Sequence, residues 1–157
     1  MAKEEPKYVS EKKINLNITT PRGLKFVEEA DMIIMRCIDG DLGVLPGHEP
    51  VSTVLGDGIL RIINNGNEMK LAVFGGIAVI EDKRVNIFTT IAQRPEEIDR
   101  ERAEIDRRKV EAMLEESEEH QFHKLQMLLR HSLIRIEVSS HLEESEYLKH
   151  NVEDEEE

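Results

Sequence analysis

The sequence has few of the residues that build disulfide frameworks, aromatic cores or membrane spans. It contains no tryptophan, 4% aromatic residues and one cysteine, Cys37, in 157 residues. A single cysteine excludes an intrachain disulfide and a Cys-x-x-Cys metal site, and it suits a reducing compartment. There is no run of eighteen apolar residues, and residues 1–10 lack the apolar stretch of a signal peptide. We therefore expect no membrane-spanning segment, and membrane association only through a protein partner.

Motifs of catalysis are missing as well. Neither a Gly-x-x-x-x-Gly-Lys-Ser/Thr phosphate loop nor a Gly-x-Ser-x-Gly nucleophile elbow occurs in the chain. His120 and His123 have a spacing that a shared metal would allow, but they adjoin a charged stretch and are interpreted as exposed histidines. Cys37 lies in an apolar segment, as a packed thiol does. The sequence therefore predicts a protein that is not an enzyme and has no cofactor.

Charge divides the chain into two dissimilar parts. The formal net charge is −12. Residues 1–94 carry 12 basic and 13 acidic side chains, whereas residues 95–157 carry 9 basic and 20 acidic ones. Because nucleic-acid affinity comes mainly from lysine and arginine displacing counterions, this balance argues against a nucleic-acid partner.

The first part has the pattern of strands. Ile14, Leu16 and Ile18 alternate with polar residues, which is the period of a sheet with one wet face. Asn65-Gly66 is a strong hairpin signal, because both residues accept the positive φ of a type I′ turn. We predict an antiparallel β-sandwich over residues 1–94, with further strands at Ala30–Ile38, Gly58–Ile63, Met69–Phe74, Ile77–Ile80 and Val85–Phe88.

The second part has the pattern of helices. No glycine or proline follows Pro95, and Pro95-Glu96-Glu97 suits a helix N-terminus. The polar run Glu115–His120 predicts the bend of an α-helical hairpin over residues 95–152, followed by an acidic tail at 153–157. The first helix is weakly amphipathic, so we expect the hairpin to lean on the sandwich or on another protein and to be mobile. The second helix has a clearer apolar stripe, formed by Phe122, Leu125, Leu129, Leu133 and Ile136. The predicted fold class is α+β.

One loop stands out within the first part. Residues 39–50, Asp-Gly-Asp-Leu-Gly-Val-Leu-Pro-Gly-His-Glu-Pro, are dense in glycine and proline. Loops of this kind often carry function, because a rigid scaffold positions them at the surface. The alternative is a tight connection that only turns a corner of the sandwich.

The same loop carries a resemblance to a known family. Residues 39–62, DGDLGVLPGHEPVSTVLGDGILRI, closely resemble the signature of the epsilon subunits of bacterial F-type ATP synthases. Residues 74–93, FGGIAVIEDKRVNIFTTIAQ, look like the second characteristic stretch of that family, and residues 14–35 fit its first hairpin. The resemblance runs in order from about Ile14 to His141.

The resemblance implies a non-catalytic rotor component of the central stalk. Such a subunit couples ion translocation to ATP synthesis and regulates ATP hydrolysis through its mobile helices. Its sandwich binds the gamma subunit and the ring of c subunits, and its helices contact the alpha and beta subunits transiently. The implied location is the cytoplasmic face of the cell membrane, as a peripheral part of the complex.

Particular residues match positions of the family's motif. Asp41, with Leu42, occupies the acidic position that faces the c-ring loops, and His48, with Pro46 and Gly47, occupies the position close to gamma. An exposed carboxylate in such a contact would contribute orientation more than affinity.

Some bacterial members bind ATP at an Ile-Asp-x-x-Arg-Ala motif, and this chain has Ile98, Asp99, Arg102 and Ala103 at its fixed positions. The resemblance implies ATP as a regulatory ligand, with Asp99 accepting from the adenine amino group and Arg102 meeting phosphate. Binding members use two further arginines one turn apart, whereas the candidates here, Arg130 and Arg135, are five residues apart. The alternative is a helix opening whose charges serve solubility.

The extended helices of the family present positive charge to an acidic segment of the beta subunit. Residues 100–109 include four arginines and a lysine, but the chain beyond Leu142 is strongly acidic and like charges would oppose deep insertion. Our hypothesis is normal rotor coupling with weak or altered inhibition.

Two alternative functions, from other classes of protein, remain open. The first is a coiled-coil factor that inserts into the secondary channel of RNA polymerase, with Glu115–Glu119 as its acidic tip; that family resembles the reverse order of domains. The second is a small-ligand β-barrel with a dimerising pair of helices.

Overall fold

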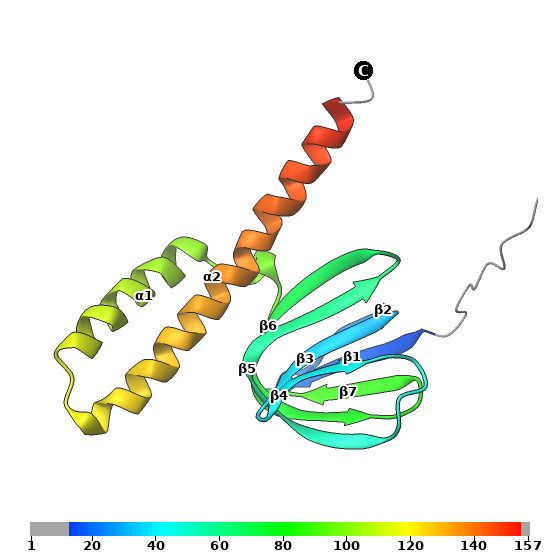
Figure 1. Ribbon diagram of the computed structural model, residues 1–157, viewed down its shortest axis with the longest axis horizontal. Helices are drawn as coiled ribbons and strands as arrows, with labels where there is room; N and C mark the ends of the chain where they lie inside the picture. Colours follow the sequence, from blue (N-terminus) through cyan, green and yellow to red (C-terminus); the bar gives the residue numbers. More distant parts are fainter. Residues whose placement is uncertain (1–12, 155–157) are drawn as a thin grey trace, which may run out of the picture.

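The computed structural model describes residues 13–154, which form a β-sandwich followed by two long helices (Figure 1). The α+β prediction is confirmed. The strands are β1 (Ile14–Thr20), β2 (Gly23–Ala30), β3 (Met32–Cys37), β4 (Gly40–Val44), β5 (Val51–Asn64), β6 (Asn67–Ile80), β7 (Arg84–Phe88) and β8 (Ala92–Gln93). The helical part consists of the 3-10 turn η1 (Pro95–Glu97), α1 (Arg100–Glu115) and α2 (Glu119–Asp154).

One sheet, folded on itself, supplies both layers of the sandwich. The strand order is β2-β1-β7-β6-β5-β3-β4, with β8 paired to β6. All neighbours along this path are antiparallel except β1 and β7, which are parallel. Figure 1 shows β5 and β6 curving from one layer into the other. Because β5 and β6 run through both layers, the outer face of one layer continues into the outer face of the other.

The core follows the period-two pattern of the sequence. Ile14, Leu16 and Ile18 are at most 1% exposed, and their polar neighbours on β1 point outward. Cys37 is buried with them, so the prediction of a packed thiol is confirmed. Burying an aliphatic side chain of this size stabilises the fold by about 1.5–3 kcal/mol. The core therefore makes the sandwich the stable body that positions the rest.

The β5–β6 hairpin turns as predicted. Asn65 has φ +51° and Gly66 has φ +78°, which are values of a type I′ turn. Lys13 ties this turn to the start of β1, because its Nζ lies 2.5 Å from Asp31 Oδ1, 2.7 Å from Asn64 Oδ1 and 3.0 Å from Asn65 Oδ1. The hydrogen bond from Lys13 is the main cause that lowers the pKa of Asp31 below its usual 3.8.

The strand boundaries around the glycines differ from the prediction. Met69–Phe74 and Ile77–Ile80 are not two strands but two halves of β6, and Gly58–Ile63 is only the later part of β5. Glycine pairs at these positions bend the strands without ending them. Gly76, at φ +116°, lies so close to β7 that a Cβ there would be 2.2 Å from the Phe88 carbonyl oxygen.

The helices begin later than the proline suggested. Pro95 opens the short turn η1, and α1 begins at Arg100 with Asp99 as its N-cap. The Asp99 carboxylate accepts a hydrogen bond of 3.1 Å from the Arg102 backbone N–H. The polar run ends α1 at Glu115 and opens α2 at Glu119, so the predicted bend is confirmed.

The side of α2 that packs on the sandwich is not the predicted stripe. Phe122 and Leu133 are 42% and 47% exposed, whereas Ile134 and Val138 are buried against the sheet. The apolar stripe alone does not identify this face, because several of its members are polar. The described helices include none long and apolar enough to cross a bilayer. The helix α2 continues through residues 153 and 154, which were predicted to belong to the acidic tail. Residues 1–12 and 155–157 lie outside the described part of the chain.

Candidate functional site

An exposed row of apolar side chains crosses the sandwich at β5, β6 and β7. Val54 pairs with Ile77 and Ile77 pairs with Phe88, so the three side chains lie side by side on one face. They are 49%, 49% and 51% exposed. Alternate residues on the same strands point into the core and are buried. The row is therefore the outer face of the sheet, and it is apolar where an antiparallel sheet facing water is normally polar.

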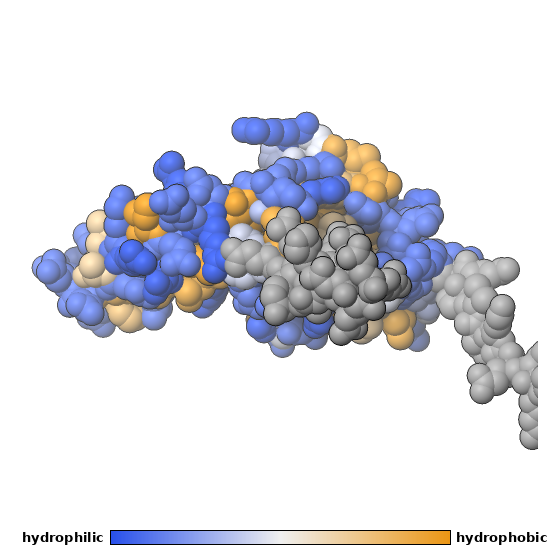
Figure 2. Space-filling model, turned by 90° about the horizontal axis from the view of Figure 1, so that it is seen from above, coloured by the Kyte–Doolittle hydropathy of each residue, from blue (hydrophilic) through white to orange (hydrophobic). Residues whose placement is uncertain are grey.

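The row continues past β5 toward β3. Ile38, which is 71% exposed, donates its backbone N–H to the Val54 carbonyl at 3.1 Å. Figure 2 shows that most of the visible surface is polar and that apolar side chains gather in separate areas. We call Ile38, Val54, Ile77 and Phe88 the apolar row. Sequence reasoning missed it, although apolar residues at both alternating positions of a strand were a usable signal.

The predicted ring-facing residues lie on the edge strand β4. Asp41 is exposed, and its Oδ1 lies 3.1 Å from Nε of Arg36 on β3. Both side chains of this pair are more than half exposed. Leu42, in contrast, is half-buried and packs against the core. The structure thus leaves the Asp41 carboxylate accessible, while Leu42 anchors the strand beneath it.

The predicted gamma-facing residues form a turn after β4. The His48 backbone N–H donates to the Leu45 carbonyl at 3.1 Å, and the Gly47 N–H donates to the Asp82 carbonyl at 2.8 Å. Gly47 has φ +86°, which favours glycine. His48 is half-buried, and its Nδ1 lies 2.7 Å from the Glu49 carbonyl oxygen. The turn containing Pro46, Gly47 and His48 is therefore fixed against the β6–β7 connection. It is a separate feature from the Arg36–Asp41 pair.

The Ile-Asp-x-x-Arg-Ala residues have clear structural roles. Ile98 packs against the small cluster that joins the hairpin to the sheet, Asp99 caps α1, and Ala103 is buried in the hairpin. Arg102 is exposed. Packing and capping thus account for three of the four fixed positions.

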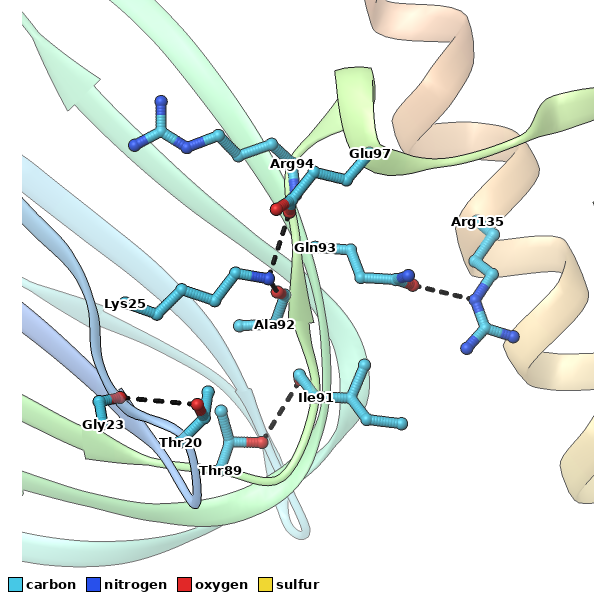
Figure 3. A network of polar contacts seen from close by, with 10 residues as sticks. All are labelled: Thr20, Gly23, Lys25, Thr89, Ile91, Ala92, Gln93, Arg94, Glu97 and Arg135. Carbon is cyan, nitrogen blue, oxygen red and sulfur yellow. Dashed lines mark hydrogen bonds and ion pairs between the residues drawn. The ribbon is translucent and has the colours of Figure 1, made fainter.

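The two arginines of α2 lie on different sides of that helix. The Arg135 Nε donates to Gln93 Oε1 at 2.9 Å, with the two side chains pointing toward each other (Figure 3). Its guanidinium also lies 4.8 Å from the centre of the Phe74 ring, and burial lowers the pKa of Arg135. Arg130 instead lines a half-open groove of about 760 Å³ between α2 and the outer face of β3–β5, together with Arg36 and Arg61. The structure does not bring the two arginines together.

A polar network fixes the connection between the sandwich and the helices. Lys25 Nζ lies 3.1 Å from Glu97 Oε2, and the same carboxylate accepts the Arg94 backbone N–H at 2.8 Å (Figure 3). Burial raises the pKa of Glu97, but the hydrogen bonds from Arg94 and Lys25 outweigh it and leave the pKa lowered. In the described part of the chain, histidine, cysteine and carboxylate side chains form no group of three suited to a metal ion.

Comparisons with known proteins agree on one family. Residues 13–95 match the family described as "ATP synthase, Delta/Epsilon chain, beta-sandwich domain". The ATP synthase epsilon chain of Pelotomaculum thermopropionicum is 40% identical over 106 residues, which are 68% of this chain and 79% of that one. The epsilon chain of Desulforamulus reducens is 34% identical over 125 residues, covering 79% of this chain and 95% of the relative.

A solved structure gives the same answer. A chain in the cryo-EM structure of the Euglena gracilis mitochondrial ATP synthase, described as OSCP/F1/c-ring in rotational state 1, superposes with a TM-score of 0.67. The two chains are 28% identical, and the match covers 75% of this chain and 76% of the other. The likeness therefore extends beyond the sandwich alone.

Proposed function

The chain belongs to the ATP synthase epsilon-chain family, and from that premise we propose that it joins the turning shaft of the enzyme through the apolar row. It is a non-catalytic subunit of a rotary ATP synthase. The partners follow from the family: the gamma subunit, the ring of c subunits and, transiently, the alpha and beta subunits. The alternative of an RNA polymerase channel factor is not supported, because the β-domain comes first and matches the ATP synthase family.

The observation that carries the proposal is the exposure of the apolar row. Val54, Ile77 and Phe88 leave about half of their surfaces in water although they sit at the middle of a sheet face. A contiguous apolar patch with polar surroundings is characteristic of protein–protein contact. Covering it removes apolar surface from water at about 25 cal/mol per Å². The gamma subunit is the partner that fits, since it is the shaft on which the family's sandwich sits.

The ring contact is assigned to Asp41. Its carboxylate is exposed on an edge strand and already tolerates a basic neighbour, Arg36, so basic groups on the ring's polar loops would find it accessible. Exposed ion pairs contribute about 0–1 kcal/mol, so this contact orients the subunit more than it holds it. Pro46, Gly47 and His48 form a rigid turn, and we assign it to the border of the gamma contact.

The regulatory part is residues 95–152, with the sandwich at 1–94 and the acidic tail at 153–157. In this assignment the helical hairpin moves between a position on the sandwich and a position beside gamma. The subunit itself lies peripherally on the cytoplasmic face of the membrane, as part of the complex. ATP is proposed as a ligand of the docked hairpin through Asp99 and Arg102, with Arg130 and Arg135 as the candidate arginines of α2. A dissociation constant for MgATP above cellular ATP levels would rule out ATP as a regulatory ligand.

Binding of purified gamma subunit tests the main proposal. The variant Ile77→Glu places a charge in the centre of the apolar row, and we expect it to weaken association by about a hundredfold. The matched control is Val27→Glu, which puts the same charge at another exposed apolar residue, on β2, 63% exposed and outside the row. Equal affinities of the two variants for gamma would show that the apolar row is not the gamma-binding surface.

A further inference from the structure

The attachment of α2 to the sandwich has little apolar surface. Ile134 and Val138 pack against Ala72 and Phe74, with Ile98 and Ile59 at the margin. His131, Arg135 and His141 of α2 add polar contacts with the sandwich. A contact with so few buried aliphatic side chains contributes modestly, so the polar contacts have a large share in deciding whether α2 stays in place.

His131, like Arg135, makes two independent contacts with the sandwich. Its ring stacks on Phe74, with ring centres 4.1 Å apart and an angle of 15° between the planes. Its Nε2 lies 2.9 Å from Asp57 Oδ2. Both side chains are about one-fifth exposed, so neither is freely solvated. A hydrogen bond with a carboxylate is stronger than a bond between neutral groups, and losing it leaves a partly buried partner unpaired.

The sandwich presents the two receiving groups side by side. Asp57 and Phe74 are Cα partners on β5 and β6, so their side chains rise on the same face. Asp57 lies between Gly56 and Gly58 on β5. One residue of α2 therefore engages both strands at once.

The neighbouring polar contacts of α2 are of a different kind. Arg135 reaches Gln93, a neutral amide, and His141 Nε2 lies 2.9 Å from a backbone carbonyl, that of Glu68. The His141 Nδ1 is buried without a partner. Of these three contacts, only the one at His131 joins the helix to a carboxylate of the sheet.

We propose that His131, Asp57 and Phe74 form a latch that sets how much of the time the helical hairpin is docked on the sandwich. The docking itself is a property of the isolated chain. Only its consequence, release of the hairpin toward gamma, rests on the proposed function.

Energy transfer between fluorescent labels measures the docking directly. Labels at Glu116→Cys in the hairpin bend and Lys83→Cys in the β6–β7 turn report their separation in the full chain, with the buried Cys37 left in place. We expect Asp57→Ala to raise the ratio of undocked to docked hairpin about tenfold. Glu49→Ala, which removes an exposed carboxylate from the turn held against the β6–β7 connection, is the matched control and should leave the ratio unchanged.

A double-mutant cycle separates the hydrogen bond from the ring stacking. His131→Phe keeps an aromatic ring on Phe74 but cannot bond Asp57, so the double variant with Asp57→Ala should undock little more than the stronger single variant. Hydrogen exchange of the amides of residues 131–142 in the unlabelled chain provides a second measurement, with faster exchange expected in the same variants. Strictly multiplicative effects on the ratio, or an Asp57→Ala ratio equal to that of the control, would overturn the latch.

ATP hydrolysis by the reassembled complex then tests the consequence. If the labels show undocking in Asp57→Ala while hydrolysis is unchanged, the latch stands and the regulatory role of the hairpin fails. If Asp57→Ala leaves docking unchanged, the latch is wrong whatever the complex does.

Discussion

Substitution of Gly76 by alanine should be among the most damaging single changes in the sandwich. The residue sits in the middle of β6 at φ +116°, a backbone conformation that side chains rarely adopt. An added Cβ would lie 2.2 Å from the Phe88 carbonyl oxygen and 3.0 Å from the Thr89 Cβ. Neither neighbour can yield easily, because the first is backbone and the Thr89 hydroxyl donates to the Gly75 carbonyl at 2.8 Å.

The magnitude follows from two separate costs. An unfavourable backbone conformation costs about 1–3 kcal/mol, and forcing an extra methyl group into a packed site costs about 1–3 kcal/mol more. Gly76→Ala should therefore lower the free energy of unfolding by about 2–6 kcal/mol. Gly66→Ala is the matched control, because Gly66 also has positive φ, +78°, but nothing within 4 Å of an added Cβ. It should cost about 1–2 kcal/mol, from the backbone alone.

Urea unfolding followed by circular dichroism in the far ultraviolet measures the difference. The midpoint should fall much further for Gly76→Ala than for Gly66→Ala, with similar slopes for the two variants. In thermal unfolding, each kcal/mol corresponds to about 2–4 °C for a chain of this size. If the two variants were destabilised equally, the close approach of β6 to β7 would not be a feature of the folded protein, and the reasoning would be refuted.

Three further predictions concern pH, capping and inhibition. The pKa of Asp31 is lowered in the folded state, so its contribution to stability is present above its unfolded-state pKa and disappears as the pH falls through the folded-state value. Lys13→Met should therefore weaken the loss of stability on acidification below about pH 4, as measured by urea midpoints at several pH values. Asp99→Ala removes the N-cap of α1 and should destabilise the hairpin by about 1 kcal/mol, seen as faster hydrogen exchange at the start of α1. Deleting residues 95–157 should activate ATP hydrolysis of the reassembled complex only slightly, and a large activation would contradict weak inhibition.

The sequence predicted the parts of the fold that depend on local chemistry. Alternation along Ile14–Thr19 needs only the geometry of a strand, and Asn65-Gly66 needs only a tolerance for positive φ. The polar run before His120 likewise marked the bend, because nothing there had an apolar face to bury. These elements form where the residues themselves decide the conformation.

The parts that failed depend on distant neighbours. Gly75 and Gly76 look like a break between strands, yet Phe88 at the end of β7 and Thr89 directly after it pack against them, and β6 is continuous. The packing side of α2 could not be assigned from the sequence for a similar reason. His131 belongs to it only because Asp57 and Phe74, far away in sequence, meet it there.

The candidate sites show the same division. The loop residues Asp41 and His48 were found from sequence because a glycine-rich, proline-rich segment is visible in one dimension. The apolar row was not, because its members come from three strands and from the end of β3, and only their register brings them together. Each looks like an ordinary strand residue when read alone.

The apolar row and the latch lie at the two ends of one bend in β5 and β6. Val54 and Asp57 flank it on β5, and Ile77 and Phe74 flank it on β6, with Gly75 and Gly76 between them. A change at the bend itself, such as Gly76→Ala, would alter both surfaces and could not tell one from the other. Ile77→Glu and Asp57→Ala act on opposite sides of the bend, so a chain that loses gamma but keeps its hairpin docked, and one that does the reverse, would show that the two surfaces work separately.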